Sequence, residues 1–315
     1  MYQVAEIRMT RPDRLVDVLA VKFGDRVKEN VSLAPYTSAR IGGTADVLIT
    51  ANSAGELCEI MRLIWKAKTD YFILGGGSNV LISDRGVRGI TILNRAKAVR
   101  FEKKNALKVW AESGVVLSNL ANRCASKGLS GLEWAATVPG SIGGAVYGNA
   151  GAFGGDMAGS LVSVELMTES GPERWPVEKM DYDYRTSILK RHEIKAMVLS
   201  AELTLKNATK EEVPVKIEGF SKRRKTTQPP GASMGSMFKN PPGDFAGRLI
   251  EAAGLKGTRI GNAEISPLHG NFFINHGKTD ARDIRALIEL ARKAVKDQFG
   301  IELELEIELI GEWDV

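Results

Sequence analysis

The stretch from Gly131 to Gly159 reads GLEWAATVPGSIGGAVYGNAGAFGGDMAG and decides the fold prediction. It contains nine of the chain's 33 glycines, and glycine at that density weakens helices and strands alike. A low-complexity segment is the alternative, but large apolar residues such as Trp134, Ile142 and Phe153 recur through it. The stretch is therefore predicted to form ordered loops at a ligand.

Two shorter glycine loops lie upstream, IGG at residues 41–43 and GGGSN at residues 75–79. Consecutive glycines allow main-chain N–H groups to approach phosphate oxygens, because no Cβ stands in the way. Neither GxxxxGK[ST] nor GxGxxG with an acidic residue ~20 positions later is present, so no P-loop or Rossmann site is predicted. One glycine turn can be a tight connection only, but three such loops suit a long cofactor that carries a diphosphate.

Composition limits the class of protein. The chain has 315 residues, 43% hydrophobic and 26% charged, which fits about two globular domains and excludes a disordered, collagen-like or coiled-coil chain. No apolar run reaches the ~18 residues of a membrane span, and no export signal is evident at the start. Cys58 and Cys124 are isolated thiols, which suits a reducing cytoplasm. His192, His269 and His276 are scattered, so no metal site is predicted.

The net charge of +5 comes from 43 basic and 38 acidic residues and is compatible with anionic ligands. The one basic cluster is SKRRK at residues 221–225. A solvated helix face is the commonest role for such a run, and a phosphate contact for a small ligand comes next. A nucleic-acid patch comes last, because no aromatic residues interleave with the cluster.

The N-terminal third of the chain alternates between helix and strand patterns, and strand patterns return after the glycine-rich stretch. Ser53 and Glu56 form a capping box that begins one helix. Helices are expected at residues 11–22, 53–68 and 115–126. Strands are expected at residues 45–50, 71–74, 89–93, 107–111, 161–167 and 196–205.

A boundary is expected where the basic cluster runs into QPPG at residues 228–231. Beyond it the patterns predict helices at 244–253 and 279–299, the second stopped by Gly300, and a short strand at 271–275. Residues 301–310 alternate strictly between apolar and acidic side chains, which predicts one long final strand. The fold class is therefore α+β, a glycine-rich ligand domain followed by a smaller domain.

Seven segments, in order, resemble the UDP-N-acetylenolpyruvoylglucosamine reductase family. Together they extend from about Leu33 to Gly311, and their order makes the resemblance specific. The segments are ARIGGTADVLI, ILGGGSNVLISDRGVRG, GLEWAATVPGSIGGAVYGNAGAFGGDM, YDYRTSIL, GSMFKNP, LIEAAGLKGTRIGNAEISPLHGNFFIN and IELELEIELIG.

The resemblance implies the fold and the reaction. The fold is an FAD-binding domain of the vanillyl-alcohol-oxidase/PCMH-like type, with two α/β subdomains, at residues 1–212, and a smaller α+β substrate-binding domain at 213–315. NADPH reduces the FAD, which then delivers hydride to the enolpyruvyl group of UDP-N-acetylglucosamine-enolpyruvate. The product is UDP-N-acetylmuramate for peptidoglycan. The flavin is expected to be non-covalent, because Thr44 stands where covalent relatives often carry histidine.

Three catalytic residues are carried over by motif. Ser236 matches the proton donor, Arg185 the arginine that faces the substrate carboxylate, and Glu306 the C-terminal glutamate that works with it. From the residues alone, a turn serine is the commoner role for Ser236, and a surface ion pair is the commoner role for Arg185. The acidic residues at 302, 304 and 308 share the strand face of Glu306, and the family's proline at position 305 is absent, so a slip would put Glu304 in the role.

The resemblance also assigns binding residues. The candidates for the pyrophosphate of the UDP-sugar are Arg224, Lys225, Lys239 and Asn240. The spacing from Arg185 to Ser236 resembles the branch that lacks an extra loop with a substrate-covering tyrosine. The FAD-binding residues are Arg40, Ile41, Gly42, Gly43, Gly75, Gly76, Gly77, Ser78, Asn79, Pro139, Gly140, Ser141, Gly143, Gly144, Asn149, Ala150 and Gly151.

Two rival functions follow from the same residues. An oxidase on the same fold would use O₂ and would need no serine acid paired with Arg185 and Glu306. A binding protein that holds a nucleotide or RNA through residues 221–225 would purify colourless, and its affinity would fall steeply with salt. Nucleic acid and membranes are not expected as partners of the reductase.

Overall fold

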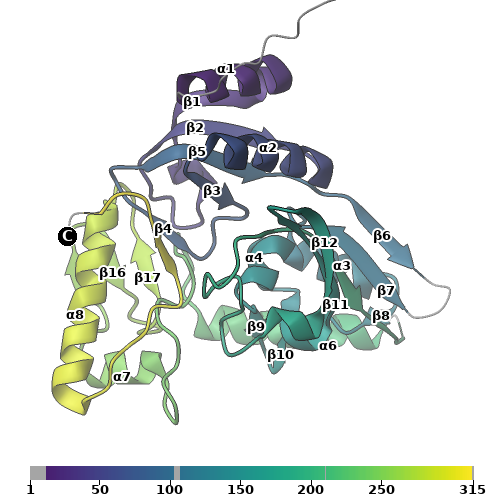
Figure 1. Cartoon of the computed structure of the whole chain (residues 1–315). Coiled ribbons are helices and arrows are strands. Elements are labelled where there is room, and N and C mark those ends of the chain that lie inside the picture. The colour runs from purple at the N-terminus through teal and green to yellow at the C-terminus, as the bar shows by residue number, and fades with distance from the viewer. Residues whose placement is uncertain (1–11, 103–106, 210, 314–315) are drawn as a thin grey trace, which may run out of the picture.

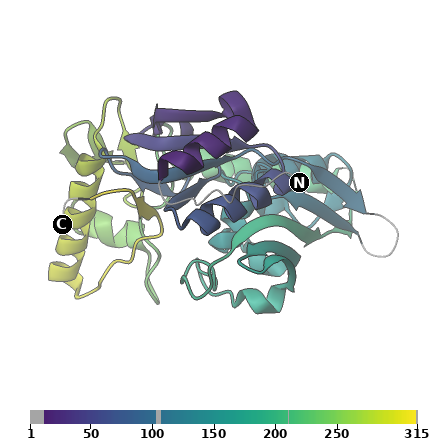
Figure 2. The same cartoon turned by 45° about the horizontal axis from the view of Figure 1, so that its top comes forward.

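The computed structural model describes residues 12–102, 107–209 and 211–313. Three units follow one another along the chain (Figure 1), and Figure 2 shows the C-terminal unit on one side and the first two on the other. The first unit is a four-stranded sheet with the order β1-β2-β5-β3, in which β1 is antiparallel to β2 and the other pairs are parallel. Its strands are β1 (Val27–Ser32), β2 (Thr44–Ala51), β3 (Tyr71–Leu74) and β5 (Val87–Asn94).

Two helices, α1 (Pro12–Phe23) and α2 (Ala54–Ala67), contribute to the core of the first unit. The Ser53 cap predicted for α2 is confirmed, because the Ser53 hydroxyl accepts the Glu56 N–H at 3.2 Å; the Glu56 carboxylate accepts the N–H of Asn52, one residue before the cap, at 2.8 Å. Leu57, Ile60 and Ile64 recur at helical spacing and are fully buried, so one face of α2 packs inward.

The second unit is a five-stranded antiparallel sheet with the order β12-β11-β13-β7-β6. Helix α4 contacts β13, and apolar residues of α3 and α4 fill the main core of this unit. The elements are β6 (Val99–Glu102), β7 (Lys108–Glu112), α3 (Leu117–Ala125), β8 (Leu129–Ser130), α4 (Ile142–Tyr147), β9 (Gly151–Ala152), β10 (Gly155–Asp156), α5 (Met157–Ser160), β11 (Leu161–Thr168), β12 (Gly171–Pro176), β13 (Met197–Thr204), β14 (Lys206–Asn207) and α6 (Glu212–Thr227).

The third unit is a small antiparallel sheet with two helices: α8 contacts β15 and β16, and α7 contacts α8. Helix α8 ends as predicted at Gly300, whose φ of 70° is readily adopted by glycine. Within the described residues, neither the Thr279 hydroxyl nor the Asp280 carboxylate caps its N-terminus. Instead Asp84 of the first unit accepts the Ala281 and Arg282 N–H groups at 2.8 and 3.1 Å. The elements are α7 (Ala246–Ala252), β15 (Arg259–Ile260), β16 (Ala263–Ile265), β17 (Phe273–Asn275) and α8 (Ala281–Phe299).

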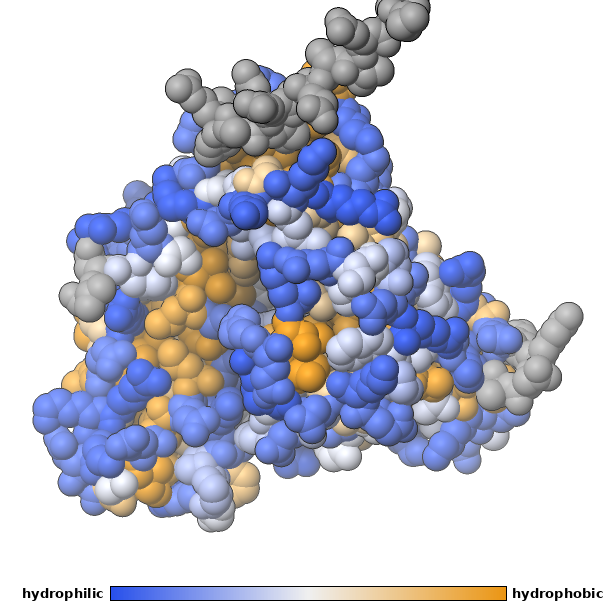
Figure 3. All heavy atoms as spheres, in the orientation of Figure 1, coloured by the Kyte–Doolittle hydropathy of each residue, from blue (hydrophilic) through white to orange (hydrophobic). Residues whose placement is uncertain are grey.

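The chain then returns to the first unit. Strand β18 (Glu308–Ile310) pairs in parallel with β4 (Val80–Ile82), which directly follows the GGGSN loop. Apolar surface covers this part of the molecule (Figure 3). The boundary predicted between residues 212 and 213 falls at the start of α6 and stays a prediction. Helix α6 packs on the second unit, where the Phe220 ring stacks on the Phe153 ring with centroids 4.4 Å apart.

Two expectations about local structure were wrong. The final strand does not run from 301 to 310, because the two parts of this range have different partners. The backbone groups of Glu304 and Glu306 bond to residues next to Phe238, whereas only β18 pairs with another strand. The glycine-rich stretch does hold short regular elements. Ser141 caps α4, and the Gly143 N–H donates to the Ser113 carbonyl at 2.7 Å, so neighbouring segments offset the weak propensity of glycine.

Candidate active site

Arg185 and Glu306 face each other between the second unit and the segment that leads into β18. Arg185 Nε lies 3.0 Å from Glu306 Oε1, and both side chains are mostly buried. The Nε–H is not aimed at the carboxylate, so this is an ion pair rather than a directed hydrogen bond. Arg185 has φ 57°, a left-handed conformation that costs energy in residues other than glycine and that recurs at functional sites.

One guanidinium nitrogen of Arg185 donates to the Gly151 carbonyl at 2.7 Å. The glycine-rich stretch therefore holds the arginine directly. Asn149 adds support, because its amide donates to the Asp183 carbonyl at 3.0 Å and its oxygen accepts the Ala158 N–H at 3.0 Å. Asn149 and Gly151, both predicted to bind FAD, thus order the loop that carries Arg185.

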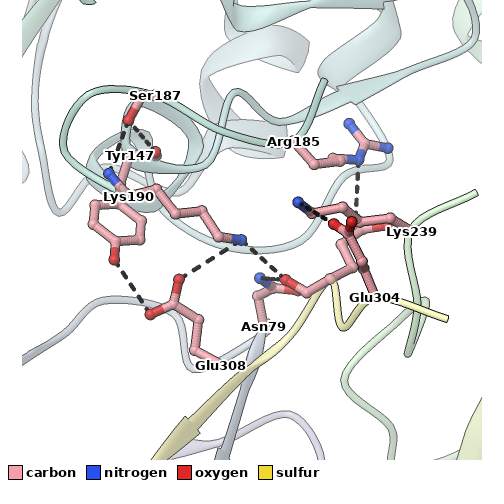
Figure 4. Close-up of polar contacts among 9 residues, drawn as sticks. Asn79, Tyr147, Arg185, Ser187, Lys190, Lys239, Glu304 and Glu308 are labelled. Atoms are coloured by element: carbon pink, nitrogen blue, oxygen red, sulfur yellow. Dashed lines mark hydrogen bonds and ion pairs between the residues drawn. The ribbon is translucent and has the colours of Figure 1, made fainter. Parts of the chain in front are cut away.

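Glu306 is fixed through its backbone. Its N–H donates to the Met237 carbonyl at 3.0 Å, and its own carbonyl accepts from both Asn79 Nδ2 and Lys190 Nζ at 3.0 Å (Figure 4). Asn79 ends the GGGSN loop, so a single backbone group joins the glycine loop to the Arg185 pair. The sequence could not distinguish Glu306 from Glu304, but the geometry does. Glu304 pairs with Lys239 at 3.2 Å, and its side chain is 75% exposed.

Burial raises the pKa of Glu306, and the nearby cations Arg185, Lys190 and Lys239 oppose that effect. Burial lowers the pKa of Lys190, while the carboxylates of Glu308 and Glu306 act in the opposite direction.

Three ion pairs lie in this region: Arg185 with Glu306, Lys190 with Glu308, and Lys239 with Glu304. We call Arg185, Glu306, Lys190, Glu308, Lys239 and Glu304 the charged cluster.

Ser236 lies close to this cluster along the chain. Ser236 forms an isolated β-bridge with Phe272. The Met237 carbonyl accepts the Glu306 N–H, and Phe238 forms an antiparallel β-bridge with Leu305. The segment that carries Ser236 therefore runs antiparallel to the one that carries Glu306. Within the described residues no partner is bonded to the Ser236 hydroxyl, which is partly exposed.

Two of the three glycine loops predicted from the sequence, at residues 75–79 and 139–144, meet each other, and the segment just before the loop at 41–43 contacts the first of them. A Cβ on Gly76 would lie 2.7 Å from Gly140 Cα, and one on Gly77 would lie 2.2 Å from the Tyr36 carbonyl oxygen. Gly77 also has φ +60° and accepts the Ser38 N–H at 2.9 Å. We call residues 41–43, 75–79 and 139–144 the glycine cradle. Side chains would separate these loops, so the close approach depends on glycine.

The glycine cradle fits the diphosphate of FAD. In the described part of the chain, the backbone N–H groups of residues 76–79 donate to no protein acceptor, which leaves four consecutive donors for an anion. Gly43 is held to Ser83 by an N–H···O bond of 2.9 Å, and Ile41 exchanges two bonds with the Thr37 hydroxyl. Arg40 is exposed beside them with φ 56°.

Residues 45–175 match the family model described as an FAD binding domain, and residues 226–310 match the C-terminal domain of UDP-N-acetylenolpyruvoylglucosamine reductase. The reductase of Chloroflexus aggregans is 41% identical over 290 residues, covering 90% of this chain and 97% of its own. That of Bacillus subtilis is 39% identical over 301 residues, covering 95% and 99%.

The chain belongs to the UDP-N-acetylenolpyruvoylglucosamine reductase family. The crystal structure of the reductase from Thermus caldophilus superposes with a TM-score of 0.78 at 36% identity, over 90% of this chain and 99% of that one. The predicted fold class and an FAD-dependent oxidoreductase are confirmed, as is the expected function, a reduction in peptidoglycan precursor synthesis. FAD is the cofactor, and the expected NADPH agrees with a reductase of this family.

The predicted substrate residues fall into two groups that no hydrogen bond or ion pair joins within the described chain. Arg224 in α6 donates to the Thr137 carbonyl, next to the cradle, and burial lowers its pKa. Lys225 beside it is exposed. Lys239 belongs to the charged cluster, whereas the Asn240 side chain accepts the Ala246 N–H of α7 at 3.2 Å.

Sequence reasoning missed four residues of this family member's site. Arg95 donates to the Gly75 carbonyl at 3.0 Å beneath the cradle. Lys190, Glu308 and Tyr147 form part of the polar network around Glu306 (Figure 4). Lys190 follows Arg185 by five residues in YRTSILK, and that proximity was the only available signal.

Among the residues that the structure describes, no group of three or more His, Cys, Asp or Glu side chains is arranged to hold a metal ion. Among the described helices, none combines the length and the apolar character that a membrane span requires.

Proposed function

We propose that this chain reduces the enolpyruvyl group of UDP-N-acetylenolpyruvoylglucosamine to give UDP-N-acetylmuramate, with NADPH as reductant. The observation that carries the proposal is the link between the two parts of the site. Asn79 of the glycine cradle bonds the Glu306 carbonyl, and Glu306 faces Arg185. A flavin held by the cradle would therefore lie next to a permanently charged guanidinium. FAD, when bound there, supplies the two-electron chemistry.

Arg185 is proposed to bind the substrate carboxylate and to stabilise the negative charge that develops on the adjacent carbon. The planar guanidinium offers several donors in a fixed fork, and Gly151 occupies only one nitrogen. Such a group stabilises charge best when it is held in place before the reaction. Glu306 is proposed to hold that orientation from the opposite side.

Ser236 is proposed to donate the proton to the carbon that carries the carboxylate. A serine hydroxyl is a weak acid, so this role requires cations that stabilise the alkoxide as it forms. Lys239 lies three residues on, in the charged cluster, and is the proposed source of that support. We therefore expect Ser236→Ala to lose most of kcat, while FAD content and reduction by NADPH stay unchanged. Full turnover by Ser236→Ala would contradict the assignment.

The remaining assignments are proposals of the same kind. The cradle residues are proposed to hold FAD without a covalent bond, and Arg224, Lys225, Lys239 and Asn240 to recognise the pyrophosphate of the UDP-sugar. The domain boundary is proposed at 212/213. The enzyme is proposed to work in the cytoplasm, with NADPH and a UDP-sugar nucleotide as its partners rather than nucleic acid or a membrane. The free thiols Cys58 and Cys124 suit that reducing compartment.

One anaerobic titration tests the reaction. NADPH should bleach the flavin absorbance of the purified protein, and UDP-N-acetylenolpyruvoylglucosamine should then restore it. A protein that bleaches but recovers its colour only on admission of oxygen would be an oxidase. A protein that binds none of the added FAD would contradict the proposed reaction and favour a binding function for residues 221–225.

A further inference from the structure

The peptide of Glu306 lies in a segment that has little regular structure. Leu305 forms an isolated bridge with Phe238, β18 begins only at Glu308, and the peptide between them belongs to no strand. Two side chains therefore fix the Glu306 carbonyl, Asn79 from the glycine cradle and Lys190 from the loop after Arg185. If this peptide turned, the Cα–Cβ bond of Glu306 would turn with it, and the carboxylate would move away from Arg185.

Lys190 is itself held at both ends through Tyr147 (Figure 4). Its backbone N–H donates to the Ser187 hydroxyl at 3.2 Å, and that hydroxyl donates to the Tyr147 carbonyl at 2.6 Å. Its ammonium lies 3.6 Å from Glu308 Oε1, and Glu308 Oε2 accepts the Tyr147 hydroxyl at 3.3 Å. These contacts close a ring that starts and ends at one tyrosine. The Lys190 side chain is only 14% exposed, so its ammonium has little freedom.

The charges around Lys190 also link its ammonium to Glu306. The groups that act on its ammonium are the carboxylates of Glu308 and Glu306 and the ammonium of Lys239. Lys190 in turn favours the ionised form of Glu306, together with Arg185 and Lys239. The ammonium thus acts on Glu306 twice, once through the backbone carbonyl and once through the carboxylate charge.

We infer that Lys190, held by Glu308 and Tyr147, is a positioning residue that fixes Glu306 opposite Arg185 during the reduction of the enolpyruvyl group. The inference rests on the proposed function. It concerns the half-reaction in which the substrate is reduced, because Glu306 and Arg185 act there. Flavin binding and flavin reduction by NADPH are proposed to depend on the glycine cradle, and among the described residues the Lys190 ammonium is linked to it through the Glu306 carbonyl that it shares with Asn79.

The first test compares Lys190→Met with Lys195→Met, both on the flavin-loaded full chain. Methionine keeps most of the length of the lysine side chain and removes the ammonium with its charge. Lys195 is a matched control, because it pairs with Glu169 on the surface, with side chains 55% and 64% exposed. We expect Lys190→Met to slow flavin reoxidation by the enolpyruvyl substrate about 10- to 100-fold. Flavin content and reduction by NADPH should stay within about twofold, and Lys195→Met should match the wild type.

A second measurement separates positioning from packing. Without the Lys190 charge, the pKa of Glu306 should rise, so the acid limb of the pH–rate profile should move to higher pH. Lys190→Arg restores a cation and should recover part of the rate and the wild-type limb. Glu308→Gln keeps a group that can accept the Tyr147 hydroxyl but removes the charge that orients Lys190, and it should show a smaller loss of rate.

Two results would overturn the inference. One is wild-type reoxidation by Lys190→Met with an unchanged acid limb. The other is a loss of flavin content and of reduction by NADPH as large as the loss of reoxidation, which would indicate a general structural role. If Lys190→Met does not fold, Glu308→Gln decides, and an unchanged rate and limb in that variant would be equally negative. If the wild type itself fails to reoxidise with the enolpyruvyl substrate, the proposed function fails first.

Discussion

The glycine cradle and the charged cluster are adjacent but are built on opposite principles. The cradle depends on side chains that are absent: its loops approach so closely that a Cβ on Gly76 or Gly77 would meet backbone atoms at 2.7 or 2.2 Å. The cluster depends on long side chains from distant segments, joined across the Glu306 backbone. A methyl group at Gly76 or Gly77 would push two backbone segments of the cradle apart, whereas a substitution in the cluster removes one contact and pushes no backbone segments apart.

The largest effect should come from Gly77→Ala in the cradle. The new Cβ meets the Tyr36 carbonyl, so the loop must open, and we expect purified protein with most of its flavin lost. Gly24→Ala is the matched control, since Gly24 has the same φ of +60° with no atom within 4 Å of the new Cβ. It should lose about 1–2 kcal/mol of stability, because alanine is strained at this positive φ, and keep its flavin. Flavin per chain, measured by absorbance, checks both, and full flavin in Gly77→Ala would break the comparison.

Arg185→Lys should have the next largest effect. Lysine keeps the charge but loses the fork that reaches Gly151 and the substrate together, so we expect kcat to fall by about 10²-fold or more. Flavin content should not change, because the cradle is untouched. Stopped-flow reoxidation and flavin absorbance measure the two quantities separately. If flavin were lost instead, Arg185 would belong to the cradle rather than to the cluster.

The smallest expected losses of kcat are those of Glu306→Gln and Glu304→Gln, and the difference between them tests which glutamate faces Arg185. Burial raises the pKa of Glu306, so its carboxylate is protonated, and the pair with Arg185 weakened, as the pH falls through a value above 4.5. Glu306→Gln should therefore lower kcat about tenfold at neutral pH and flatten the acid limb of the pH–rate profile. Glu304→Gln, at an exposed ion pair, should change neither by more than about twofold. Equal losses in the two variants would undo the geometric assignment.

The two regions also differ in what the sequence reveals. A glycine run is visible in the sequence and its reason is local, so residues 41–43, 75–79 and 139–144 could be predicted as one ligand site. The charged cluster is assembled by tertiary contacts. Alternation with period two puts Glu304, Glu306 and Glu308 on one face, and nothing local says that only Glu306 meets Arg185. The predicted strand at 301–310 failed for the same reason, since its backbone partners lie near residues 79 and 238.

The parallel pairing of β18 with β4 sets an order of events during synthesis. Strand β4 and the GGGSN loop leave the ribosome more than two hundred residues before their partners Glu306 and Glu308–Ile310. Until those last residues emerge, the edge of β4 and the amide of Asn79 are without these partners, and Asp84 has no helix to cap. A nascent chain that stops short of Glu306 thus carries every cradle glycine and yet lacks the segment that completes the site. The flavin pocket is finished among the last parts of the molecule, although its glycines are translated among the first.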